Sequence, residues 1–243
     1  MAVAIDPGVA VVLERVEESF GIQFRPGELN DESCFSDLCA AVIAHLTQTK
    51  TDRCFTSIVF WRLRRGCVES FGTLRSEVRP WTPTDLILPR SGRRQAWHRL
   101  AESTGLKLPA LEYSSGVASF IFLGGAVSAT ALTIPFAYDW AHLASLLVSF
   151  PLSHYLLFRL CRPFANQLSA QSVTIGDLAK AAVGLNYGKL AQELGGVSRE
   201  QELLDAIRHV VADLIDIRPE IFRSENPRLI DLEDANDGFR AEV

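Results

Sequence analysis

The runs GVASFIFLGGAVSATALTIPFA, residues 116–137, and LASLLVSFPLSHYLLF, residues 143–158, decide the predicted fold. No Asp, Glu, Lys or Arg occurs from Gly116 to Tyr138 or from Trp140 to Phe158, and only Asp139 separates the two stretches. Each stretch is close to the ~20 apolar residues with which an α-helix crosses the hydrocarbon core of a bilayer. The sequence therefore predicts an all-α protein built around a two-helix transmembrane hairpin over residues 116–160.

The charges on either side of this hairpin predict its orientation. Residues 50–99 hold eleven Lys and Arg against four Asp and Glu, whereas the turn between the apolar runs holds no Lys or Arg. Basic loops stay on the cytoplasmic side of a membrane. We therefore expect a multi-pass inner-membrane protein with both termini in the cytoplasm.

Three helical regions flank the hairpin in this interpretation, over residues 1–50, 51–112 and 165–243. The first and last contain amphipathic patterns, in VAVVLERVEESF at 9–20 and LLDAIRHVVADLID at 203–216, where apolar residues recur at helical spacing. The five cysteines lack CxxC or Cys/His zinc spacing, which is typical of buried thiols in a reducing compartment. We predict no metal site and no cofactor.

Parts of both flanks resemble acyl carrier proteins. The pair LERVEESFGIQF (13–24) and FSDLCAAVIAHL (35–46) is similar to helices II to IV of that family. Residues 203–232 are similar to its helix I and to the loop that leads to the carrier serine. The resemblance implies a carrier-like bundle in permuted order, completed when the two cytoplasmic flanks come together.

The resemblance fails at the position that carries the cofactor in the family. Counting back fourteen residues from Phe20, where the family has its phosphopantetheine-bearing serine, the chain has Asp6. The run that follows Leu232 also begins without a serine. A carrier-like fold in this chain would therefore carry nothing by that route.

A cluster of basic residues precedes the first apolar run. Its members are Arg90, Arg93, Arg94 and Arg99, with Trp97 among them. Contact with anionic lipid headgroups is one interpretation, a topology signal alone is a second, and a protein partner is a third. Nucleic acid is not an expected partner, because residues 1–115 hold fourteen basic and fourteen acidic side chains.

The first apolar run contains small residues four positions apart, in the pairs Gly124/Ser128 and Gly125/Ala129. Such spacing lets two helix backbones approach closely. The second helix of the same hairpin is the expected neighbour, and another copy of the chain is the alternative.

No Walker loop, dinucleotide fingerprint, HExxH or nucleophile elbow occurs, so no catalytic residue is predicted. The favoured function is a membrane-anchored, non-catalytic binding or adaptor module whose partners are the bilayer and another protein. A membrane enzyme acting on lipid or acyl substrates is one alternative. A small oligomeric channel or transporter subunit, assembled through the Gly124/Ser128 face, is another.

Overall fold

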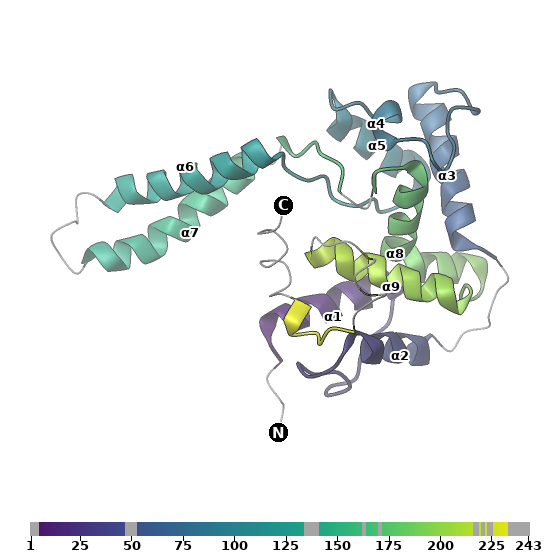
Figure 1. The fold of residues 1–243 in the computed structure, drawn as a ribbon, viewed down its shortest axis with the longest axis horizontal. Coiled ribbons are helices and arrows are strands. Elements are labelled where there is room, and N and C mark those ends of the chain that lie inside the picture. Colours follow the sequence, from purple (N-terminus) through teal and green to yellow (C-terminus); the bar gives the residue numbers. More distant parts are fainter. Residues whose placement is uncertain are drawn as a thin grey trace. The chain divides into compact units, whose positions relative to one another are not determined.

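The computed structural model describes residues 5–46, 53–133, 141–161, 164–169, 172–215, 219, 222 and 226–232, and it describes no side chains at 132–133 and 141–146. Over these residues the chain is helical, and its β-structure is limited to isolated bridges. The all-α prediction is confirmed. The helices are α1 (Pro7–Phe20), α2 (Phe35–His45), α3 (Phe55–Phe71), α4 (Thr84–Ile87), α5 (Arg93–Thr104), α6 (Ser115–Thr133), α7 (Ala141–Cys161), α8 (Ile175–Leu194) and α9 (Glu200–Ile215) (Figure 1).

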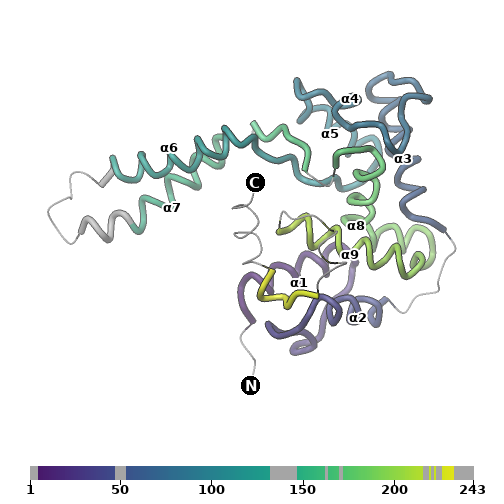
Figure 2. Tube along the Cα trace, viewed as in Figure 1, coloured from purple at the N-terminus to yellow at the C-terminus, as the bar shows by residue number. Residues whose placement is uncertain are grey.

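The chain forms two compact units. The core unit comprises residues 1–89, 95–109 and 169–243, and the hairpin unit comprises residues 90–94 and 110–168. The hairpin unit contains α6 and α7, which run side by side in opposite directions (Figure 2).

The transmembrane assignment of residues 116–160 is wrong. Within the described part of the chain, no helix combines the length and the apolar character that a bilayer span requires. Glycine, serine and threonine recur through α6, and α7 contains Pro151 and His154 among its apolar residues. The multi-pass inner-membrane location is overturned by the same finding. Residues 134–140, which hold most of the predicted turn, lie outside the described residues.

Helix α8 is the centre of the core unit. It contacts α1, α3 and α9, and it is buried on all sides over much of its length, as expected for a helix enclosed by others. Two glycines allow this enclosure. A Cβ at Gly184 would lie 2.9 Å from the carbonyl oxygen of Ala206 in α9, and one at Gly188 would lie 2.5 Å from that of Phe20 in α1.

An aromatic cluster joins α1 and α3 to α8. The ring of Tyr187 lies 5.0 Å from that of Phe20 and 5.2 Å from that of Phe55, centroid to centroid. Its hydroxyl accepts a hydrogen bond from the backbone N–H of Ser198 and lies 2.8 Å from the Ser198 hydroxyl. Burial raises the pKa of this phenol. The polar end of the cluster is thereby satisfied, and three helices share one apolar core.

The start of α2 meets the last described residues in the core unit. The backbone N–H of Phe35 donates to the carbonyl of Pro227, and that of Leu229 donates to the carbonyl of Ser33, at 2.9 and 2.8 Å. The rings of Phe35 and Phe222 stack at 4.5 Å. The beginning of α2 is therefore held by residues almost two hundred positions later in the chain.

Candidate interaction surface

The hairpin unit packs its small residues inward. Ala129 is fully buried, and the Ser153 hydroxyl of α7 donates to the carbonyl of Gly125 in α6 at 2.9 Å. A Cβ at Gly125 would lie 2.6 Å from the His154 ring, whereas one at Gly124 would be at ordinary contact distance, 3.4 Å, from Leu157. The seam between the two helices is thus set by Gly125 and Ala129.

Ser128, the fourth of the small residues singled out in the sequence, lies elsewhere. Its hydroxyl donates to the carbonyl of Gly124 in the same helix at 2.7 Å, and the side chain is exposed. The pair Gly124/Ser128 therefore lies at the edge of the hairpin, next to the seam that Gly125 and Ala129 form.

His154 links the helices at this seam. Its Nδ1 lies 2.8 Å from the carbonyl oxygen of Phe150 in α7, and its Nε2 lies 3.2 Å from that of Phe122 in α6. The ring also contacts the rings of both phenylalanines. The imidazole thus has a packing role between α6 and α7.

The base of the hairpin is closed by backbone and aromatic contacts. Glu112 and Gln167 exchange a pair of backbone hydrogen bonds, at 2.9 and 3.1 Å. The ring of Tyr113 lies 5.3 Å from that of Phe158, and its hydroxyl donates to the Phe158 carbonyl. The two helices are therefore held together at the base as well as along the seam.

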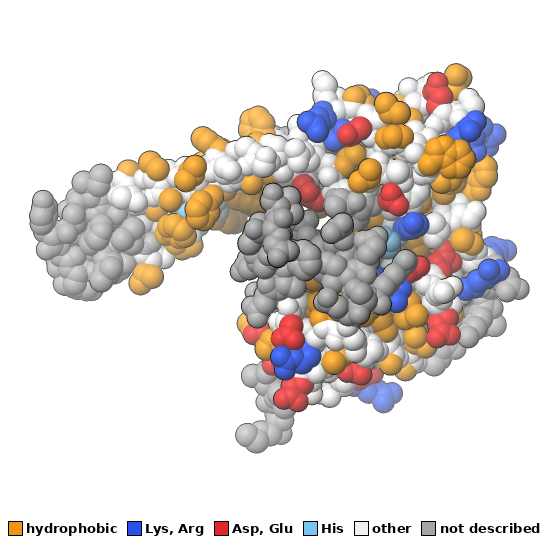
Figure 3. All heavy atoms as spheres, viewed as in Figure 1, with side chains coloured by type: hydrophobic (Ala, Val, Ile, Leu, Met, Phe, Trp, Pro, Cys, Tyr) orange, Lys and Arg blue, Asp and Glu red, His pale blue; other side chains and the backbone are white. Residues whose placement is uncertain are grey.

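Large apolar side chains are exposed to solvent on both helices. Leu147, for example, is 78% exposed. We call the set the outer face: Phe120, Phe122, Leu123, Val127, Leu147, Val148, Phe150, Leu152, Tyr155, Leu156, Phe158 and Leu160. Hydrophobic side chains are visible along the hairpin in the space-filling view (Figure 3).

The outer face is large enough to form a stable interface. Large apolar and aromatic side chains present on the order of 150 Å² each when free, and eleven of the twelve are more than half exposed, so the set leaves on the order of 1,000 Å² uncovered. A standard interface buries about 800 Å² on each partner. Exposed apolar surface of this extent is a mark of an interaction site on a folded protein.

The predicted headgroup cluster does not form one exposed surface. Arg93 is only 2% exposed, and its Nη1 donates to the carbonyl of Asn166 at 2.9 Å. Trp97 is buried, with its indole N–H donating to the carbonyl of Pro109 at 3.0 Å. Arg90 and Arg99 are exposed, and Arg94 is half-buried. Two of the five side chains thus serve packing.

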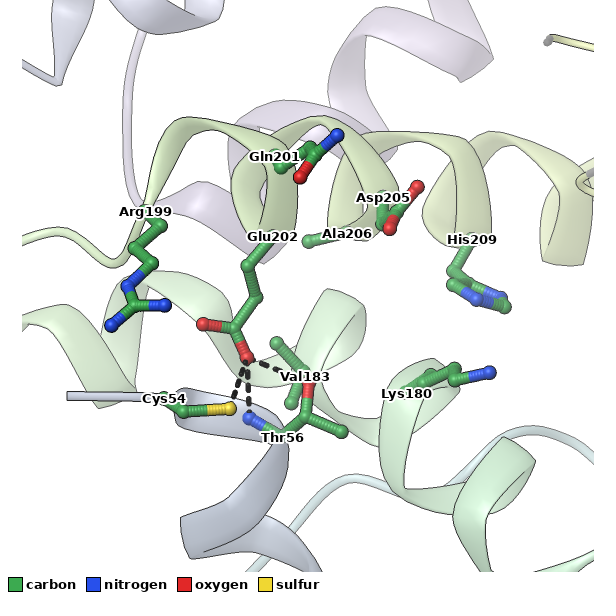
Figure 4. A pocket seen from close by; sticks show the side chains of 10 residues that line it. All are labelled: Cys54, Thr56, Lys180, Val183, Arg199, Gln201, Glu202, Asp205, Ala206 and His209. Atoms are coloured by element: carbon green, nitrogen blue, oxygen red, sulfur yellow. Dashed lines mark hydrogen bonds between the residues drawn. The ribbon is translucent and has the colours of Figure 1, made fainter. Parts of the chain in front are cut away.

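A cavity of about 290 Å³ lies in the core unit between α9, α8 and the start of α3 (Figure 4). Glu202 points from α9 to the first turn of α3. Its carboxylate accepts hydrogen bonds from the backbone N–H groups of Phe55 and Thr56, at 3.1 and 2.6 Å, and from the Thr56 hydroxyl at 2.6 Å. The Cys54 thiol donates to the same carboxylate.

Glu202 therefore acts as an N-terminal cap supplied by another helix. A carboxylate at this position satisfies backbone donors that have no partner within the helix, and it complements the positive end of the helix dipole. Arg199 lies at one end of the cavity, and Lys180 and His209 lie at the other (Figure 4). The local sequence around Cys54 gives no sign of this cap, because the carboxylate comes from about 150 residues later in the chain.

Comparison with protein-family models, with curated proteins and with solved structures gives no match to this chain. No group of three or more His, Cys, Asp or Glu side chains placed to hold a metal ion occurs among the residues that the structure describes. The outer face of the hairpin contains twelve of the large apolar side chains that are exposed in the described part of the chain.

Proposed function

We propose that this protein is a non-catalytic binding module and that it associates with another polypeptide through the outer face of the α6–α7 hairpin. The observation that supports the proposal is the inverted packing of this hairpin. Glycine, alanine and serine fill the seam, while phenylalanine, leucine and valine face solvent. A hairpin that functioned alone would gain stability by turning its large side chains inward, where their burial is favourable.

The form of the surface favours a polypeptide partner over a small ligand. Small-molecule sites are concave pockets with a few converging polar groups. The outer face instead lies on the outside of two packed helices, and α6 alone is roughly 28 Å long at 1.5 Å per residue. Apolar helix faces of this kind pack against helices or grooves of partner proteins.

Site-specific photo-crosslinking in living cells tests the proposal. A photoreactive phenylalanine analogue replaces Leu147 on the outer face in the full-length chain. The control places the same analogue at Leu86 in α4, which is 74% exposed and belongs to the core unit. We expect Leu147 to give a discrete adduct of higher protein mass and Leu86 to give none.

The adduct at Leu147 is then compared with adducts at Leu156 and Val127. Leu156 follows Leu147 by nine residues and so lies on the opposite flank of α7, and a partner that encloses the exposed part of the hairpin should be captured at all three positions. Adducts that contain only lipid would overturn the proposal. So would equal crosslinking from Leu147 and Leu86.

A further inference from the structure

A second exposed surface lies on the core unit, at the side of α3. Trp61 is 51% exposed, and the guanidinium carbon of Arg64 lies 4.9 Å from the centre of its ring. Arg64 is itself anchored, because its Nε donates to the carbonyl of Arg75 at 3.0 Å. This hydrogen bond joins the exposed side of α3 to the loop after it.

The loop after α3 contains a second exposed tryptophan with an arginine over its ring. Trp81 is 68% exposed, and the guanidinium carbon of Arg79 lies 5.6 Å from its ring centre. The Nε of Arg79 donates to the carbonyl of Ser76, next to Arg75, at 3.0 Å. A continuous series of contacts therefore connects Trp61 to Trp81. We call these two tryptophans, with Arg64, Arg75 and Arg79, the Trp–Arg surface.

The loop that carries Trp81 is held in one conformation by its own hydrogen bonds. The Thr82 hydroxyl donates to the carbonyl of Glu77 at 2.7 Å and accepts from the backbone N–H of Arg79 at 3.0 Å. The Glu77 carboxylate accepts from the backbone N–H of Leu74. Each indole is also stacked with a guanidinium that is fixed to the backbone. Little conformational entropy therefore remains to be lost when a partner covers these tryptophans.

The charge of this surface is opposite to that of the whole chain. Residues 61–81 contain five arginines and two glutamates, within a protein of net charge −5. Arg62 is paired with Glu193 at 2.7 Å. Over the described residues, neither the Arg65 nor the Arg75 guanidinium forms an ion pair within the chain. Both side chains are exposed, so this stretch offers guanidinium donors for external carboxylates.

We propose that the Trp–Arg surface binds an acidic peptide segment of a partner protein. Guanidinium groups bind carboxylates through paired hydrogen bonds, and tryptophan and arginine are the residues that contribute most to binding at protein interfaces. A polyphosphate partner is disfavoured because the protein is acidic overall, with a pI of 5.6. The surface lies on a different unit from the outer face, so this inference goes beyond the hairpin-mediated association and does not depend on it.

Fluorescence anisotropy with a defined probe tests the inference. The probe is a fluorescein-labelled peptide of alternating glutamate and leucine, titrated with the full-length protein. We expect saturable binding that Trp61→Ala and Trp81→Ala each weaken about tenfold. Val11→Ala, which truncates an exposed apolar side chain of α1, should leave the affinity unchanged.

A pair of charge reversals distinguishes binding at the Trp–Arg surface from general electrostatic attraction between the protein and the probe. Arg75→Glu and Arg25→Glu change the net charge equally at exposed positions, but only Arg75 belongs to the Trp–Arg surface. We expect Arg75→Glu to abolish binding of the acidic probe and Arg25→Glu to weaken it only slightly. Equal losses would overturn the inference, as would the absence of any saturable binding.

Two further probes give the competing outcomes. Tighter binding of an oligouridylate than of the peptide would assign the surface to nucleic acid. Tryptophan-dependent binding to phosphatidylserine vesicles, with no binding of the peptide, would assign it to a lipid surface. Either result overturns the inference. Crosslinking at Leu147 reports on the hairpin separately, so failure of one proposal is distinguishable from failure of the other.

Discussion

Gly188 shows how closely the core depends on single atoms. Its backbone lies against the end of α1, where Phe20 precedes the left-handed Gly21 that terminates the helix at φ +65°. A methyl group would meet the backbone of Phe20, which has no rotamer that could relieve the contact. Overpacking of this kind costs ~1–3 kcal/mol.

Gly188→Ala should therefore destabilise the protein by about 2 kcal/mol or more, because α1 must move away from α8. Urea unfolding followed by circular dichroism measures the change. Gly116→Ala is the control, since a Cβ at that helical glycine would meet nothing within 4 Å. It should be neutral or stabilising by up to ~1 kcal/mol. Equal effects of the two substitutions would contradict this account of α8.

Cys67 gives a pH dependence whose sign follows from its burial. Burial raises the pKa of this thiol from 9.0 to about 12. Between these values the unfolded chain releases the proton and the folded chain keeps it, so stability is complete below pH 9 and falls as the pH rises. One such proton corresponds to about 1.4 kcal/mol per pH unit.

In Cys67→Ala the free energy of unfolding should fall less steeply above pH 9, because the contribution of this one proton is absent. The substitution should also lower the free energy of unfolding at neutral pH, because it leaves a small cavity. The free energy of unfolding, measured in urea between pH 8 and pH 10.5 for both proteins, gives the two slopes. Identical slopes would show that the thiol is not protected in the folded state.

At the scale of the elements, contacts between helices decide how individual helices end and pair. The first turn of α3 has no side-chain cap from its own N-cap residue, and Glu202 of α9 supplies one. The hairpin follows the same rule, because α6 and α7 meet where Gly125 leaves room for His154.

Glu202→Ala should destabilise the protein by about 1–2 kcal/mol, the usual cost of losing a helix cap. Hydrogen exchange at the backbone N–H groups of Phe55 and Thr56 should accelerate in the variant, because both lose their acceptor. Gln201→Ala removes a neighbouring exposed side chain of the same cavity and should change neither quantity. Unchanged exchange in Glu202→Ala would contradict the capping role.

Gly125→Ala should weaken the contact between α6 and α7, because the new methyl group would lie within 2.6 Å of a ring that both helices hold. Hydrogen exchange measured over α6 and α7 should increase. Gly124→Ala, one residue earlier, should leave exchange nearly unchanged, since its Cβ has ordinary contact with Leu157. A larger increase of exchange in Gly124→Ala than in Gly125→Ala would contradict a contact between α6 and α7 at Gly125.

Local patterns predicted much of this element structure. Apolar spacing at 9–20 and 203–216 located α1 and α9. Helix α1 begins slightly earlier than predicted, at Pro7, because the Asp6 carboxylate accepts from the Gly8 backbone N–H at 2.8 Å. That aspartate occupies the carrier-serine position of the resemblance to acyl carrier proteins, which stays a prediction.

These local patterns could not predict which residues far apart in the sequence contact one another. A basic cluster looks alike in sequence whether its members are exposed or, like Arg93 and Trp97, buried. The composition of residues 116–158 correctly predicted two adjacent helices. It could not decide their surroundings, because an apolar side chain gains by leaving water whether lipid or protein replaces it.

At the scale of the whole molecule, two compact units each present an exposed surface of distinct character. The hairpin unit has the apolar outer face, and the core unit has the Trp–Arg surface. A chain with two such surfaces could hold two partners at once, which is the property of an adaptor. The outer face is the larger of the two surfaces, and the proposed function depends on it.

The most direct test of that function compares the native mass of the wild-type protein with that of a variant whose outer face carries added charges. Val127→Glu with Leu156→Glu places two carboxylates on exposed positions of α6 and α7, so the free energy of unfolding should change by no more than ~0.5 kcal/mol per site. We predict that the wild-type chain, isolated gently from its own cells, migrates as a complex and that the variant migrates as the free, folded protein. A variant that keeps the wild-type complex would contradict association through the outer face.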